Sequence, residues 1–227
     1  MSRATLLVAT VCMVVAATGC GSGSESDAPQ ATPPATPQAT PKPRSEVAAR
    51  VVQGERFFGI PAISGVAVRT DPGELSAELP GFYADPEKAV ADLRKDGFVA
   101  GVGRTFKSGG PAGASHVVIQ MRDAQGATAE FERQIDSVLH QPCPPGLQCE
   151  QESERFDVPG IPGAAGLNTT VTIKDNPNSV HPDVLRADTI VFRDDAFVEQ
   201  VFLGTESPGK HRAALIRAAQ GLYQQGT

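Results

Sequence analysis

Apolar residues recur along the second half of the chain with a spacing that predicts three helices. Residues 85–87, Asp-Pro-Glu, supply an N-cap candidate, a proline in the first turn and an early acid. Gly97 follows where a C-terminal cap is expected. Residues 127–140 and 207–223 carry apolar stripes on helical spacing, the last helix starting at Ser207-Pro208.

Between these helices, shorter apolar segments predict strands. Gly101 and Gly103 lie in the first of them, where they weaken the strand or mark a bulge. Short connections between consecutive strands favour antiparallel pairing. We therefore expect an α+β fold, an antiparallel β-sheet packed by about three α-helices. The predicted strands are residues 98–106, 116–121, 169–174, 189–192 and 197–203, with a weaker candidate at 65–69.

The first residues have the pattern of a secretory signal. Arg3 makes the start positive, and the uncharged apolar run 6–17 is too short to span a bilayer. Small residues then lead into Cys20, which resembles a bacterial lipobox. We expect residues 1–19 to be a lipoprotein signal peptide and Cys20 to be acylated. A plain secreted protein with a nearby cleavage site is the alternative.

Residues 20–44 contain no core-forming side chain after the anchor cysteine. Ala-Thr-Pro repeats every four residues, which favours extended polyproline II. At about 3.1 Å per residue, this segment could hold a domain roughly 70 Å from the anchor. It is predicted to be a disordered stalk, either semi-rigid and O-glycosylated on its threonines or an unmodified tether.

Composition sharpens this division of the chain. The 227 residues have a net charge of −6, and without the signal 19 basic and 26 acidic residues leave −7. This charge argues against a nucleic-acid binder that uses a basic surface. Residues 45–227 have a length suited to one globular domain.

Two of the four cysteines remain for the domain, since Cys12 leaves with the signal and Cys20 takes the lipid. In an oxidising envelope compartment, Cys143 and Cys149 are expected to form a structural disulfide. A redox or metal pair is the alternative. Five residues separate these cysteines, however, whereas redox pairs typically have two between them.

No catalytic, cofactor-binding or metal-binding residue is predicted. Residues 204–210, GTESPGK, match part of a phosphate-binding loop, but His211 replaces the Ser or Thr that would hold magnesium. Pro208 also lacks a backbone N–H for phosphate. A turn before a capped helix is the simpler interpretation. The four histidines lack zinc-like spacing, and no nucleophile-elbow motif occurs in the domain.

These features together resemble cell-envelope lipoproteins of actinobacteria. The resemblance is carried by the lipobox, the Thr/Pro-rich stalk and the segments AVADLRKDGFVAGVGRTF, HVVIQMRDAQGATAEF and FVEQVFLG. It implies a fold similar to PsbP/Mog1-like or kinase-sensor-like domains, with an antiparallel sheet flanked by helices. It implies no catalytic residues. Kinase-sensor relatives often have two disulfides, whereas this domain has cysteines for one.

The resulting hypothesis is a lipid-anchored protein on the extracytoplasmic face of the membrane, without a cofactor. Its domain would bind an envelope protein, a lipid or a cell-wall ligand in a groove between sheet and helices. The alternative is an envelope hydrolase that uses Ser115-His116, or His181 near Asp183. A lipid carrier is a third option and requires a large apolar cavity.

Overall fold

A computed structural model describes residues 44–107, 113–141, 143, 148–174, 183–205 and 209–226. The predicted signal, the Cys20 anchor and most of the predicted stalk lie outside these residues and stay predictions. The described residues belong to one compact unit, Pro37–Thr227. All three clusters of buried apolar side chains lie within this unit, so it carries its own core and folds by itself.

A six-stranded antiparallel sheet forms the centre of the unit. Its strand order is β3-β4-β8-β7-β6-β5, and a small hairpin of β1 and β2 lies outside it. The predicted α+β fold with an antiparallel sheet is confirmed. The strands are β1 Arg56–Phe57, β2 Ile60–Pro61, β3 Phe98–Lys107, β4 Gly113–Met121, β5 Gln148–Phe156, β6 Ala165–Lys174, β7 Asp183–Asp194 and β8 Phe197–Gly204.

The described part of the chain contains five helices. They are α1 Arg44–Arg50, α2 Pro72–Glu78, α3 Pro86–Asp96, α4 Ala124–Leu139 and α5 Arg212–Gly226. The three longest are the predicted ones, and the short α1 and α2 come from a region without a clear pattern. The caps predicted for α3 are present, with Asp85 accepting from the Lys88 N–H and Gly97 left-handed at φ 87°.

The start predicted for the last helix was too early. α5 begins at Arg212, not near Ser207-Pro208. Gly209 has a positive φ of 75°, a turn conformation that interrupts a helix at that point.

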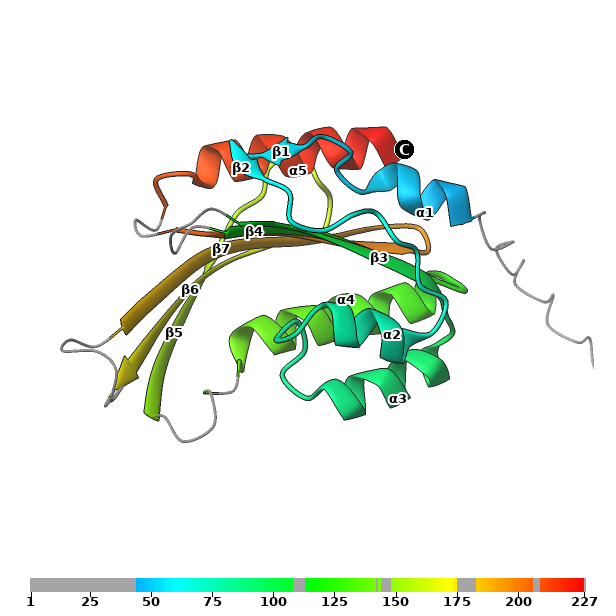
Figure 1. Cartoon of the computed structure of the whole chain (residues 1–227), viewed down its shortest axis with the longest axis horizontal. Coiled ribbons are helices and arrows are strands. Elements are labelled where there is room, and N and C mark those ends of the chain that lie inside the picture. The colour runs from blue at the N-terminus through cyan, green and yellow to red at the C-terminus, as the bar shows by residue number, and fades with distance from the viewer. Residues whose placement is uncertain are drawn as a thin grey trace, which may run out of the picture. The chain divides into compact units, whose positions relative to one another are not determined.

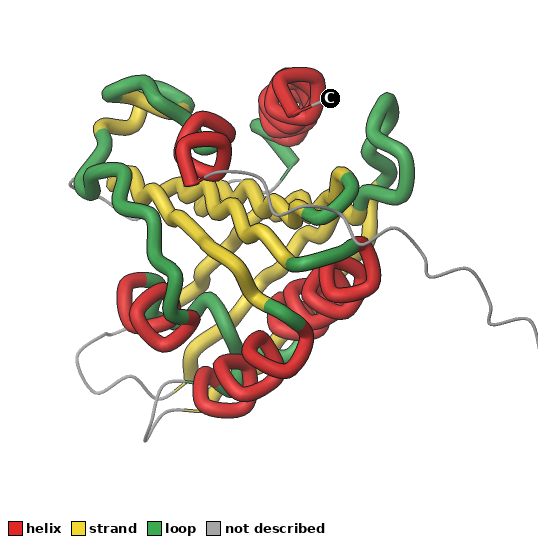
Figure 2. Tube along the Cα trace, turned by 90° about the vertical axis from the view of Figure 1, so that its right-hand side faces the viewer, coloured by secondary structure: helices red, strands yellow, loops and turns green. Residues whose placement is uncertain are grey.

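The sheet is covered on both faces, as Figures 1 and 2 show. α1, α5 and the β1–β2 hairpin pack on one face, which we call the covered face. α2, α3 and α4 pack on the other, which we call the groove face, and they reach only part of it. Successive residues of a strand point to opposite faces, so each strand supplies both layers.

The two glycines of β3 allow α2 to approach the groove face. A Cβ on Gly101 would meet Leu75 Cδ2 at 2.5 Å, and one on Gly103 would meet Leu79 Cδ2 at 2.5 Å. The register irregularity of β3 lies between Phe98 and Ala100 instead. Phe98 therefore packs with the α3–α4 core, whereas Ala100 packs in the cluster on the covered face.

The two edges of the sheet differ. Along β3, an extended segment is joined by single bridges from Ala62 to Phe106 and from Arg69 to Gly101. Residues 65–69 thus lie beside the sheet edge but are not one of its strands. On the opposite edge, β5 is polar and mostly exposed, which discourages pairing with other chains. Its sequence lacks apolar alternation, and it was missed for that reason.

Candidate functional site

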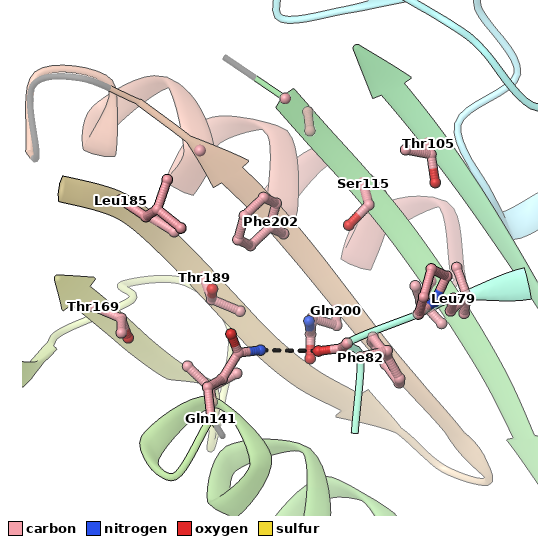
Figure 3. Close-up of a pocket in the computed structure, with 18 of the residues that line it drawn as sticks. Leu79, Phe82, Thr105, Ser115, Gln141, Thr169, Leu185, Thr189, Gln200 and Phe202 are labelled. Carbon is pink, nitrogen blue, oxygen red and sulfur yellow. Dashed lines mark hydrogen bonds between the residues drawn. The ribbon is translucent and has the colours of Figure 1, made fainter. Parts of the chain in front are cut away.

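A groove of about 690 Å³ lies on the groove face. It is lined by the α2–α3 loop, the end of α4 and the strands of the sheet (Figure 3). Its volume is in the range of small-molecule sites, about 300–1,000 Å³.

The floor of the groove consists of the inward-facing residues of adjacent strands. Thr105 on β3 pairs with Ser115 on β4, and Ser115 pairs with Phe202 on β8. Phe202 in turn pairs with Thr189 on β7. These side chains therefore form one row across the sheet, with Gln200 beside it (Figure 3). The floor therefore contains hydroxyl and amide groups as well as apolar side chains.

The roof is apolar and is tied to its surroundings by backbone-directed hydrogen bonds. Leu79, Phe82 and Val138 line it. The side chain of Gln141, just after α4, donates to the Gly81 carbonyl at 2.9 Å (Figure 3). This bond joins the α2–α3 loop to the end of α4, so the two parts of the roof are held together.

The end of α4 is also tied to the edge strand β5. Gln151 Nε2 donates to the carbonyls of Val138 and Leu139 at 2.8 and 2.9 Å. These carbonyls are unsatisfied at a helix C-terminus, and Gln151 satisfies them. A disulfide joins Cys143 to Cys149, with the Cα atoms 5.6 Å apart. The predicted pairing of these cysteines is therefore present, and it fastens the roof to the sheet.

The charged residues in the described lining of the groove lie at its margins. Glu78 forms an ion pair with Arg69, and Lys107 ends β3 in an exposed position. Arg186 lines the groove but, by strand alternation with Leu185, belongs to the other face of β7. The floor itself is uncharged, so a ligand group that lies on the floor finds no counter-ion there.

A buried cluster on the covered face is charged, unlike the floor of the groove. Arg50 donates to Glu199 at 3.1 Å and to Asp194 at 2.9 Å. It also donates to the Gly226 carbonyl at 2.7 Å and lies over the Phe197 ring. Every charge in this cluster has a partner, and the cluster joins α1 and the end of α5 to the β7–β8 hairpin.

His116 belongs to this cluster. The Val52 N–H donates to its Nδ1 at 3.2 Å, so Nε2 carries the proton and donates to Glu199 Oε2 at 3.1 Å. Because His116 is fully buried on the covered face, it points away from its neighbour Ser115, which lines the groove. The Ser115-His116 pair of the hydrolase hypothesis is therefore not formed.

A second polar cluster lies within the helical layer. Glu130 accepts from Tyr83 at 2.7 Å and from Gln134 at 2.9 Å, and it pairs with Arg133. Burial raises the pKa of Glu130, although Arg133 and the hydrogen bonds oppose that effect. Burial, reinforced by the neighbouring Glu130, raises the pKa of Tyr83 well above its usual value. This cluster joins the α2–α3 loop to α4 and does not line the groove.

Other residues considered from the sequence are not brought into a site. His181 lies outside the described residues, and Asp183 is the first residue of β7. The Gly209 N–H donates to the buried carboxylate of Asp188 at 3.3 Å. An anionic side chain at this position disfavours phosphate, in agreement with a plain turn. The Asn168 side-chain amide also donates to Asp188, at 2.9 Å.

Within the described ranges, no group of three His, Cys, Asp or Glu side chains is placed to hold a metal ion. No helix among those residues is long and apolar enough to cross a bilayer.

No protein-family model matches the chain, and no curated protein matches it. The fold is similar to the extracellular domain of PknH from Mycobacterium tuberculosis, with a TM-score of 0.51 and 12% identity. The match covers 82% of this chain and 98% of that chain. At this identity the likeness concerns the fold alone, and it is compatible with the kinase-sensor-like fold expected from the sequence pattern.

Proposed function

We propose that this protein is an extracytoplasmic, non-enzymatic binding protein, anchored through a lipid on Cys20, whose groove holds one uncharged, lipid-like molecule. The observation that carries the proposal is the groove itself. It has an apolar roof and an uncharged floor, and its size suits one small amphiphile. The fold likeness to an extracellular domain supports a position outside the membrane.

The sheet beneath the groove favours a small molecule over a peptide. An extended peptide binds a sheet by adding a strand to an unpaired edge. The floor strands β4, β8, β7 and β6 are each paired on both sides. Their backbone groups are therefore already hydrogen-bonded, and the floor recognises a ligand through side chains.

Photo-crosslinking tests this function. The unit of residues 37–227 would be irradiated with a monoacylglycerol that carries a diazirine in its acyl chain, and labelled peptides would be identified by mass spectrometry. We expect label on Phe202, Leu185 and the roof residues, and competition by unlabelled monoacylglycerol. Label spread over the covered face, or label that excess monoacylglycerol does not reduce, would contradict the proposal.

Turnover assays address the hydrolase alternative. Purified protein would be incubated with ester and peptide panels, alongside the Ser115→Ala variant. We expect no turnover above buffer, because His116 cannot reach the Ser115 hydroxyl from the opposite face. Turnover that the variant abolishes would replace the binding function with a hydrolytic one.

A further inference from the structure

One polar group in the groove floor lacks a partner. Gln200 on β8 is only 6% exposed, and its Oε1 has no hydrogen-bond partner in the described structure. Its side chain lines the groove (Figure 3). Buried polar groups are nearly always hydrogen-bonded, so an unpaired oxygen on a side chain that lines a hollow keeps the capacity to accept a hydrogen bond from a ligand.

The neighbours of Gln200 extend this polar spot. Ser115 and Thr189 both pair with Phe202, two residues along β8 from Gln200. Each therefore lies diagonally beside Gln200 on the same face of the sheet, at the spacing where side chains still interact. The spot contains two hydroxyls and one carboxamide, and Thr189 is almost completely buried.

The chemistry of this spot selects among amphiphiles. The carboxamide oxygen accepts a hydrogen bond from a hydroxyl or an amide N–H, and hydroxyl groups both donate and accept. A charged head group would lose its hydration here without gaining an opposite charge, which is unfavourable. A hydroxylated, uncharged head group satisfies the floor while its chain lies against Phe202 and the roof.

We propose that Gln200, flanked by Ser115 and Thr189, selects ligands with an uncharged, hydroxyl-bearing head group, such as an acylglycerol or a glycosylated lipid. This inference rests on the proposed function of the groove. Gln200 is then a specificity-determining residue that contacts the ligand head group, and the apolar walls supply the remaining affinity.

A second glutamine provides a matched control. Gln120 on β4 is also buried, at 1% exposure, and its Oε1 also lacks a partner. It points to the covered face, however, and does not line the groove. Replacing either glutamine by leucine removes a buried amide whose oxygen lacks a partner, but only Gln200→Leu alters the groove.

Isothermal titration calorimetry on residues 37–227 tests the selection. The probes are monolauroylglycerol, dodecanoate and dodecyltrimethylammonium, which have chains of equal length and neutral, anionic and cationic heads. We expect monolauroylglycerol to bind most tightly. Gln200→Leu should weaken it about five-fold, the value of one neutral hydrogen bond, and Gln120→Leu should change it less than about two-fold.

The outcomes separate this inference from the function on which it rests. Equal binding of all three probes, or monolauroylglycerol binding that Gln200→Leu leaves unchanged, would overturn the selection but not the groove. Binding of none would overturn both. If Gln200→Leu does not fold, the inference is tested instead on the unmodified protein, by the side-chain amide NMR signals of Gln200. They should shift with monolauroylglycerol, and unchanged signals would overturn the inference.

Discussion

The two faces of the sheet bury different clusters of polar side chains. On the covered face, Arg50, Glu199 and His116 are charged or titratable, and they bond to one another and to backbone groups. On the groove face, Gln200 and Thr189 are uncharged, and the Gln200 oxygen bonds to nothing described. The same strands supply both sets, since β8 alone contributes Glu199 and Gln200.

This difference separates a structural cluster from a binding surface. Buried charges are tolerated only when they are paired, and removing one partner is strongly destabilising. Burying an uncharged polar group without a partner costs less free energy than burying an unpaired charge. Such a group at the wall of a hollow can still form a hydrogen bond with a ligand. We therefore expect substitutions on the covered face to change stability, and substitutions on the groove face to change binding.

The largest expected effect is on the covered face. Glu199→Gln leaves Arg50 without one buried carboxylate partner and should lower the free energy of unfolding by about 3–5 kcal/mol. Urea denaturation measures this loss. Glu150→Gln is the matched control, because its ion pair with Lys174 lies at the exposed edge and contributes less than about 1 kcal/mol. Equal losses from both variants would remove the contrast between buried and exposed carboxylates.

The next effect concerns the roof of the groove. Gly103→Ala places a Cβ 2.5 Å from Leu79 Cδ2, so the Leu79 side chain or the end of α2 must shift. Such overpacking costs about 1–3 kcal/mol. In α5, a Cβ on Gly221 meets nothing within 4 Å, so Gly221→Ala should stabilise by up to about 1 kcal/mol through helix propensity. Thermal denaturation of the two variants gives the sign of each change, and a stabilising Gly103→Ala is incompatible with the close contact of α2.

Binding can be changed without a comparable loss of stability. Leu185 lines the groove and is 53% exposed. Leu185→Asp should weaken monoacylglycerol binding by about ten-fold, or about 1.4 kcal/mol, and change stability by less than about 0.5 kcal/mol. Ile63→Asp alters an equally exposed apolar residue outside the groove. Calorimetry should show normal affinity for it, and a similar loss in both variants would mean that the groove is not the binding surface.

The smallest expected effect is a pH dependence from the helical layer. Burial raises the pKa of Glu130 above its ordinary value of 4.5. Its contribution to stability is therefore fully present below that ordinary value and is lost as pH rises through the raised pKa. The unfolding free energy of the protein minus that of Glu130→Gln should fall with increasing pH across this window. A difference that is flat or that rises with pH would show that burial does not dominate the environment of Glu130.

The sequence predicted the elements whose signals are local. The caps of α3 at Asp85 and Gly97 depend on residues within a few positions of the helix ends. β5 was missed because an edge strand buries little and shows no apolar alternation. The pairing of Cys143 with Cys149 followed from compartment chemistry rather than from any structural pattern.

The groove was predicted in kind but not in its residues. Thr105, Ser115, Thr189 and Gln200 come from four strands and lie together only through the register of the sheet. One signal was available: polar residues at alternate positions of otherwise apolar strands, as Gln200 is in β8. Whether such a residue meets a helix or a hollow depends on where α4 ends, which is a tertiary property.

The central claim is that ligand binding belongs to the groove face alone. Two-dimensional ¹H–¹⁵N NMR of residues 37–227 during titration with monolauroylglycerol tests it most directly. We expect the backbone signals of Thr105, Ser115, Leu185 and Phe202 to shift together and saturably, while those of α1 and α5 stay unchanged. Shifts centred on α1 and α5, or no saturable shift on the groove face, would contradict the account.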